Sequence, residues 1–274
     1  MFKNLKNYIV VASVALLSCT ALTSCSDDDE EDLNGGIGNT VDVNSVFPKG
    51  NYKPSGISNI TYNSDGLVSS ITDDWGGVVT FQYFNVTSRA EEAYVLMTID
   101  GEYECKMTLN NAGYVKYCVE RELYDDEADI DYWWFEYNAD GQLKYMKRSE
   151  GGNEVTNITY KNGDITDVRM VYEDENDDVG TDVSISYTNS KVSSPIQNLG
   201  GVMLWDHCFY IDMDEMKYAY YAGLLGKSTK HLPVLLTDHD YDNETESFDW
   251  ILNSDGLPIE MIWNGEYTEE TFTW

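Results

Sequence analysis

The sequence predicts an all-β protein, mainly antiparallel, in which a meander of hairpins curls into an open, barrel-like sheet with one short helix near residues 213–222. Three observations predict this fold. A turn motif of Asn, Asp and Gly recurs along the chain, apolar and polar residues alternate on both sides of it, and aromatic residues make up 13% of the composition. Asn and Asp bond to their own turn amides and Gly accepts a positive φ, so each motif marks a tight turn. Alternation with a period of two is typical of a strand with one buried face.

The first 24 residues predict a lipoprotein signal peptide. Lys3 and Lys6 precede a short apolar stretch at residues 8–17, which is the layout of a secretory signal. The sequence Leu-Thr-Ser before Cys25 then resembles a bacterial lipobox, in which the cysteine thiol receives the lipid. Cys19 also follows a suitable triplet, although its apolar stretch is shorter. Ordinary secretion with a free Cys25 thiol is the other alternative.

An acidic run follows the predicted lipidation site. Residues 26–32 contain one serine and six acids, whose mutual repulsion extends the chain. The order Ser-Asp-Asp-Asp after the cysteine resembles the signal that sends Bacteroidetes lipoproteins to the outer face of the outer membrane. We therefore expect a flexible tether over residues 25–54 and a single β-rich domain over residues 55–274.

The charge balance excludes two kinds of partner. The chain carries 49 acidic and 17 basic side chains, and the two lysines of the signal peptide are removed with it. A nucleic-acid partner requires clusters of lysine and arginine, which this chain lacks. The same balance argues against electrostatic binding to anionic lipid. We therefore expect the acyl anchor to attach the protein to the outer membrane.

The turn motif defines the hairpins. Each copy places an apolar-polar strand, an Asn-led turn containing Gly, and a second strand in succession. Full copies lead with Asn63, Asn110, Asn138 and Asn253, a shortened copy contains Asn162, and a degenerate copy contains Asn189.

One segment departs from the strand pattern. Asp212 and Glu215 resemble a capping box, and apolar residues follow at helical spacing. Gly223 stands where a glycine commonly ends a helix. These residues predict the helix over 213–222, packed against the sheet.

Two cysteines flank one of the predicted turns. If Asn110 faces Gly113, then Cys105 lies directly opposite Cys118 at a position that permits a cross-strand disulfide. Two reduced, half-buried thiols are the alternative. Cys208 has no evident base and orienting partner, so we interpret it as a core residue.

Two further patterns suggest binding sites. Asp238, Asp240, Asp242 and Glu244 alternate like the ligands of a calcium loop, and Glu246 and Asp249 extend the series. No helices are predicted beside them, so a solvated turn is the simpler interpretation. Trp133 and Trp134 are adjacent in a predicted strand, so one of them faces outward unless both faces are covered. An exposed Trp can stack on a sugar ring, whereas core packing is the alternative.

Several segments of the chain together resemble a known family. The hairpin repeats, the helix, and the stretch from Tyr221 to Pro233 with its Gly, Leu and Lys residues together resemble a group of Bacteroidetes lipoproteins described as a domain of unknown function with a porin-like fold. The resemblance implies a curled antiparallel sheet with the helical segment near its opening. It implies no catalytic residues, and the word porin-like describes only the shape.

The sequence therefore predicts a surface-exposed, lipid-anchored binding or scaffold domain whose ligand is a polysaccharide or a partner envelope protein. Catalysis is not favoured, because no nucleophile and base occur in a recognisable motif. The alternative is a glycan-acting hydrolase that uses two of the many carboxylates. No cofactor is expected apart from the calcium candidate.

Overall fold

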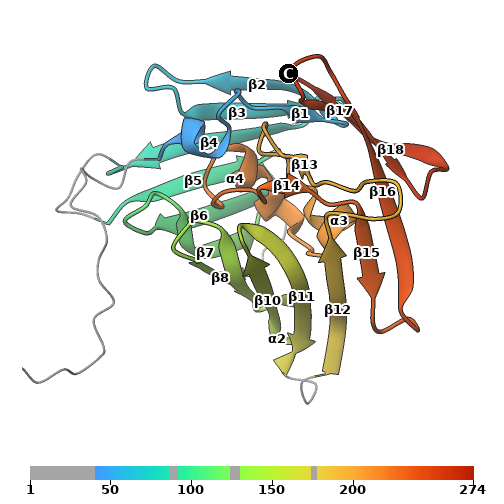
Figure 1. Ribbon diagram of the computed structural model, residues 1–274. Coiled ribbons are helices and arrows are strands. Elements are labelled where there is room, and N and C mark those ends of the chain that lie inside the picture. Colours follow the sequence, from blue (N-terminus) through green and yellow to red (C-terminus); the bar gives the residue numbers. More distant parts are fainter. Residues whose placement is uncertain (1–40, 87–91, 124–129, 174–177) are drawn as a thin grey trace, which may run out of the picture. The chain divides into compact units, whose positions relative to one another are not determined.

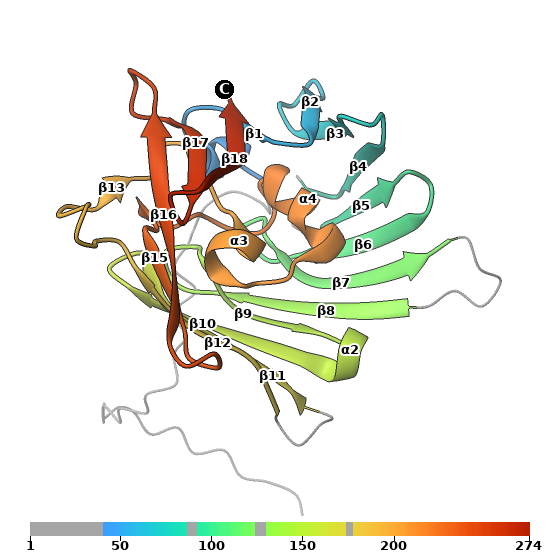
Figure 2. The same ribbon diagram turned by 90° about the vertical axis from the view of Figure 1, so that its right-hand side faces the viewer.

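One antiparallel sheet of 16 strands curls around a small group of helices (Figures 1 and 2). The computed structural model describes residues 41–86, 92–123, 130–173 and 178–274. All of them belong to one unit of the chain, Ile37–Trp274. The strands are β1 (Lys53–Pro54), β2 (Ile57–Tyr62), β3 (Val68–Asp73), β4 (Val78–Phe84), β5 (Tyr94–Ile99), β6 (Tyr103–Leu109), β7 (Val115–Glu122), β8 (Ile130–Tyr137), β9 (Leu143–Arg148), β10 (Glu154–Lys161), β11 (Asp164–Tyr172), β12 (Asp178–Ser186), β15 (Leu235–Asp238), β16 (Glu244–Leu252), β17 (Pro258–Trp263) and β18 (Tyr267–Thr273).

The predicted meander is confirmed. Strands β2 to β12 are hydrogen-bonded in chain order, β12 pairs with β15, and the meander continues to β18. Strand β18 then pairs with β1, which leads directly into β2. No ladder joins β2 to β18 within the described residues, so the barrel-like sheet keeps an open seam beside the β1–β2 link.

The Asn-led turns explain the hairpins. At Asn138, the side-chain Oδ1 accepts hydrogen bonds from the backbone N–H groups of Asp140 and Gln142, both at 3.0 Å. Gly141 follows with a φ of +80°, a conformation that only Gly adopts without steric cost. The same pair of side-chain bonds recurs at Asn63, Asn110 and Asn253. Asp73 forms an equivalent turn that the sequence pattern missed.

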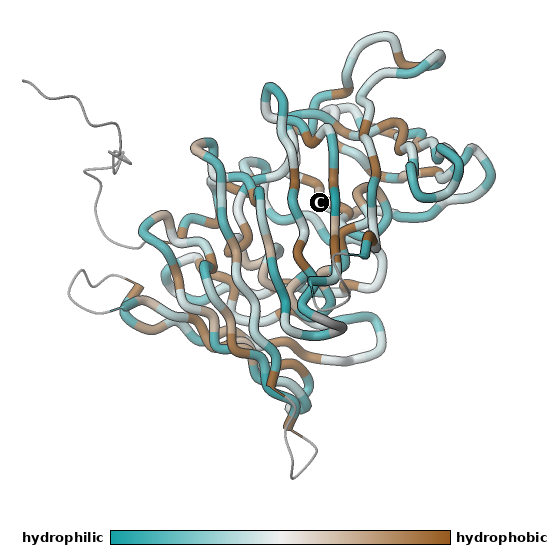
Figure 3. Tube along the Cα trace, turned by 90° about the horizontal axis from the view of Figure 1, so that it is seen from below, coloured by the Kyte–Doolittle hydropathy of each residue, from teal (hydrophilic) through white to brown (hydrophobic). Residues whose placement is uncertain are grey.

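Helices fill the inside of the sheet. Between β12 and β15, the chain forms a small ladder of β13 (Ile196–Gln197) and β14 (His231–Leu232), with three short helices inserted between these two strands. These are α3 (Trp205–Phe209), the 3₁₀ turn η2 (Asp214–Met216) and α4 (Lys217–Tyr221). Their apolar side chains are buried against the inner face of the sheet. Along the strands, hydrophobic and hydrophilic residues alternate (Figure 3).

The predicted helix is confirmed as η2 and α4. Its end at Gly223 has the expected positive φ, and the N–H of Leu224 donates to the carbonyl of Ala219 at 2.9 Å. This bond satisfies a carbonyl at the helix terminus. The preceding helix, α3, was not predicted. No described helix has the length and apolarity needed to cross a bilayer.

The packed domain begins earlier than predicted. Residues 41–54 were assigned to the tether, yet α1 (Val43–Val46), Phe47 and Tyr52 contribute to the core. The Tyr52 hydroxyl donates to the carbonyl of Met203 at 3.1 Å and accepts from its N–H at 3.0 Å. The predicted boundary at residue 54 is therefore too late, because the Gly, Asn and Pro content of this stretch concealed its apolar residues.

The predicted pairing of Cys105 with Cys118 is wrong by two residues. Cys105 lies opposite Glu120, and Cys118 lies opposite Met107. The turn is one residue longer than a two-residue loop, and a further irregularity follows at Thr108. Both thiols are free and buried. A hydrogen bond with Cys118, together with burial, raises the pKa of the Cys105 thiol.

Candidate functional site

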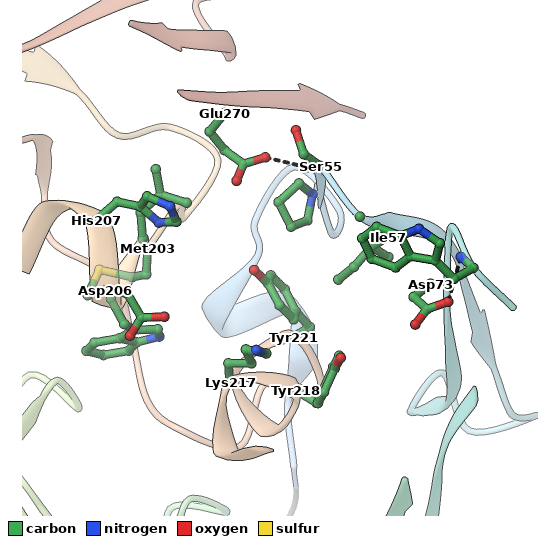
Figure 4. A pocket seen from close by; sticks show the side chains of 15 residues that line it. Ser55, Ile57, Asp73, Met203, Asp206, His207, Lys217, Tyr218, Tyr221 and Glu270 are labelled. Atoms are coloured by element: carbon green, nitrogen blue, oxygen red, sulfur yellow. Dashed lines mark hydrogen bonds between the residues drawn. The ribbon is translucent and has the colours of Figure 1, made fainter. Parts of the chain in front are cut away.

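A cleft of about 260 Å³ lies at the open seam (Figure 4). Four separate parts of the chain line it: the β1–β2 link, the β3–β4 turn, the helices α3 and α4, and strand β18. The cleft exists because the ladder is interrupted there, so side chains from the sheet and from the inner helices meet at the same opening.

Trp75 forms an exposed aromatic edge of this cleft. Its indole is 86% exposed, which is the largest value among the large apolar side chains described. The turn holds it in place, because Asp73 Oδ1 accepts from the N–H groups of Trp75 at 2.8 Å and Gly77 at 2.7 Å. The indole also lies against Gly56 in the β1–β2 link, where an added Cβ would be 3.8 Å from the ring. Trp75 therefore stands over the seam.

Helix α4 supplies a second aromatic side chain and a cation. Tyr218 and Lys217 both line the cleft, and the Lys217 ammonium lies 5.6 Å from the centroid of the Tyr218 ring. Burial, followed by the nearby carboxylate of Asp73, raises the pKa of the Tyr218 hydroxyl. The hydroxyl therefore stays protonated and remains a hydrogen-bond donor.

Carboxylates line the opposite side. Glu270 on β18 accepts hydrogen bonds from the N–H groups of Ser55 and Thr271, so it ties the β1–β2 link to the last strand. Asp206 on α3 is exposed at the surface of the cleft. Desolvation by the surrounding protein, together with Asp212, raises the pKa of its carboxyl group despite the opposing effect of Lys217. His207 is paired with Glu269 at 3.1 Å.

Trp205 provides a buried donor without a partner. It lines the cleft, it is 5% exposed, and its Nε1 has no hydrogen-bond partner within the described residues. Its ring meets Tyr220 edge to face at 5.6 Å. Leaving a buried donor unsatisfied costs about 1–3 kcal/mol.

The arrangement suits a ligand that presents both apolar ring faces and hydroxyl groups. Ring faces can stack on Trp75 and Tyr218, while hydroxyl groups can exchange hydrogen bonds with the carboxylates and the ammonium. The adjacent thiol of Cys208 takes no part, because it is fully buried as expected and burial raises its pKa.

The two Trp candidates lie elsewhere and have different surroundings. Trp133 is 1% exposed and its Nε1 donates to Glu120 Oε2 at 2.9 Å, so core packing is its role. Trp134 faces the outside of the sheet and is 37% exposed. Only Trp134 is therefore able to stack on a ligand.

The calcium candidates do not converge. Asp238 is buried at the end of β15 and lies opposite Glu244 on β16, while Asp240 and Asp242 are exposed in the connecting turn. Across residues 41–86, 92–123, 130–173 and 178–274, no group of three or more His, Cys, Asp or Glu side chains could hold a metal ion. Cys25 lies outside the described residues.

A second, strongly acidic pocket of about 290 Å³ lies between the sheet and η2. Its acids are Glu120, Glu122, Asp131, Glu150, Asp214 and Glu215. Burial, followed by the charge of Glu215, raises the pKa of Glu120 to about 7.

The sequence missed most of the cleft. The only local signal was the stretch from Asp73 to Gly77, which repeats the turn motif with Asp in place of Asn and places a Trp at its tip. No local pattern marks Asp206, Lys217 or Tyr218, because they line the same cleft as Trp75 only in the folded protein.

Comparison with known proteins agrees with this architecture. A crystal structure of a porin-like protein from Bacteroides uniformis superposes with a TM-score of 0.59 and 18% sequence identity, covering 83% of this chain and 97% of that one. That likeness concerns the fold alone. No curated protein matches the sequence. The family model described as a domain of unknown function (DUF4595) with porin-like fold matches residues 56–260, and the chain belongs to this family.

Proposed function

We propose that this protein is a lipid-anchored binding protein of the cell surface and that its seam cleft binds a glycan. One observation carries the proposal: the cleft places the exposed ring of Trp75 beside side chains that donate and accept hydrogen bonds.

The chemistry favours a sugar over other ligands. A pyranose presents an apolar face for the ring of Trp75 and several hydroxyl groups for Asp206 and Lys217. The cleft is smaller than the usual 300–1,000 Å³ of a pocket for drug-sized ligands. It therefore suits one sugar ring or the end of a longer chain.

Binding to short oligosaccharides tests the cleft. We expect Trp75→Ala to weaken binding at least about tenfold, which corresponds to roughly 1.4 kcal/mol. Tyr241→Ala is the matched control, because Tyr241 is an exposed aromatic residue in the β15–β16 turn, outside the cleft. Isothermal titration calorimetry with hits from a glycan array gives the affinities. Equal affinity of Trp75→Ala and the unchanged protein would remove the cleft as the binding site.

The lipid anchor is supported by the sequence before and after Cys25. Labelling cells with an alkyne fatty acid should tag the unchanged protein and the Cys19→Ser variant, but not Cys25→Ser. Surface exposure follows from protease digestion of intact cells. Label that persists in Cys25→Ser and disappears in Cys19→Ser would assign the anchor to the other cysteine.

A glycan-acting hydrolase is the second candidate, and the raised pKa of Asp206 favours it. A carboxyl group with a raised pKa gives up its proton less readily, which suits a general acid. Its partner would be Asp73 or Glu270, both of which already accept backbone hydrogen bonds. New reducing ends that are released by the unchanged protein and not by Asp206→Asn would establish hydrolysis. Binding without release supports the binding protein.

A further inference from the structure

Outward-facing residues form a continuous aromatic row on the outside of the sheet. Successive cross-strand partners from β4 to β9 define it: Phe84, Tyr94, Thr108, Tyr117, Trp134 and Lys147. Directly opposed residues of an antiparallel sheet share a face. The chain neighbours of the row, such as Val95 and Met107, are fully buried on the inner face. The row therefore faces outward.

A second row runs beside the first, two residues along each strand. It consists of Gln82, Leu96, Lys106, Val119 and Tyr132 on strands β4 to β8. We call the two rows together the aromatic strip. The strip contains two lysines and no carboxylate, although the chain has 49 acidic residues. A surface without carboxylates is thus unusual for this protein.

The aromatic rings of the strip support one another. Tyr117 lies 5.6 Å from Trp134 and 6.3 Å from Tyr132, measured between ring centroids. Phe84 and Tyr94 stack at 4.6 Å with their planes 9° apart. Trp134 and Tyr132 each remain 37% exposed. The rings are thus held in place by packing while part of each still faces solvent.

The shape of the strip restricts its occupant. Six strands at about 4.8 Å spacing give a length of roughly 24 Å, and two rows of side chains give a width of about 10 Å. The area of roughly 240 Å² is far below the ~800 Å² per partner of a stable protein interface. A linear chain fits this shape, whereas a globular partner or a second copy does not.

We propose that the aromatic strip is a second glycan site, which binds a neutral linear polysaccharide lying across strands β4 to β9. This inference rests on the proposed function and extends it from an oligosaccharide in the cleft to a polymer on the outer face of the sheet. Sugar rings stack on Trp134 and Tyr117. A neutral polymer meets no repulsion from the net charge of −32, whereas an acidic polymer does.

The lysines are placed to hydrogen-bond such a polymer. The Lys106 ammonium lies 4.8 Å from the centroid of the Tyr94 ring, and the Lys147 ammonium lies 6.0 Å from that of Trp134. An ammonium group donates to sugar hydroxyl oxygens. Lys147 also pairs with Glu173, which fixes its position at the end of the strip.

Native gel electrophoresis through dissolved polysaccharide tests the proposal. The probes are mixed-linkage β-glucan, arabinoxylan, galactomannan and dextran as neutral polymers, and polygalacturonate as an acidic one. We expect at least one neutral polymer to retard the protein and the Trp134→Ala/Tyr117→Ala variant to lose at least tenfold in affinity. Thermal unfolding shows whether that variant is folded, and Thr108→Glu, which inserts a carboxylate between Tyr94 and Tyr117, provides a variant with a smaller change in packing.

The variants separate this proposal from the cleft. Trp75→Ala should weaken oligosaccharide binding while keeping retardation by the polymer. If folded strip variants are retarded as strongly as the unchanged protein and Trp75→Ala is not, the cleft is the glycan site and the proposal for the strip is wrong. If no neutral polymer retards the unchanged protein, or polygalacturonate retards it more, the proposed occupant is wrong.

Discussion

Replacing Glu120 by Gln should change how the stability of the fold depends on pH. Glu120 lies on the inner face of β7, where it accepts the Trp133 indole N–H at 2.9 Å. Burial, then the charge of Glu215, raises the pKa of its carboxyl group to about 7, from an ordinary value of 4.5. Gln keeps the acceptor oxygen for Trp133 and cannot ionise, so the substitution removes the titration while retaining the contact.

The sign and size of the effect follow from proton linkage. The folded protein holds the Glu120 proton more tightly than the unfolded chain does. The stability contributed by the protonated carboxyl is therefore fully present below about pH 4.5 and is lost as the pH rises through about 7. A difference of about 2.5 pKa values corresponds to at most about 3 kcal/mol. For a domain of this size, that is roughly 6–12 °C in Tm.

Urea unfolding near pH 5 and near pH 8 measures this difference. We expect Glu120→Gln to be nearly neutral at the lower pH and to stabilise the protein by up to about 3 kcal/mol at the higher pH. Glu122→Gln is the control, because it removes one charge from the same acidic pocket but is not hydrogen-bonded to Trp133. If Glu120→Gln has the same effect at both pH values, Glu120 does not titrate with a raised pKa in the folded protein.

Two further substitutions test the turns and the packing of the inner segment. Asn138→Ala removes the acceptor for two backbone N–H groups and should lower the free energy of unfolding by about 1–2 kcal/mol. Asn111→Ala, at an exposed turn position, should change it by less than about 0.5 kcal/mol. Urea unfolding measures both values. Gly226→Ala should destabilise by more than about 2 kcal/mol in thermal unfolding, because Gly226 has a φ of +79° and an added Cβ would lie 2.5 Å from the carbonyl oxygen of Gly141.

The sequence predicted the local parts of this fold well. The turns led by Asn63 and Asn138 follow from side-chain bonds that span at most four residues, and the helix before Gly223 follows from its own cap. The predicted register at Cys105 is wrong, because one additional residue in the turn and another at the irregularity beside Thr108 together move the cross-strand partners by two residues.

The candidate site was beyond local reasoning. Trp75 and Tyr218 are far apart in the chain and line the same cleft only in the folded protein. Strand alternation predicts that either Trp133 or Trp134 faces outward, but the choice of Trp134 and its cross-strand neighbour Tyr117 required the structure. Contacts between residues far apart in the chain therefore determine the candidate site, and local sequence patterns do not reveal such contacts.

The missing ladder between β2 and β18 makes the seam the place where the sheet opens most easily. Elsewhere in the described sheet, parting two neighbouring strands breaks a row of backbone hydrogen bonds. Here β2 and β18 are connected through β1, the Ser55–Gly56 link and the hydrogen bonds of Ser55 with Glu270 and Thr271. If the proposed ligand binds in the cleft, β2 and β18 can move apart there without breaking a strand ladder. The sheet is held by strand ladders around most of its circumference, so the width of the seam is the dimension that can adjust.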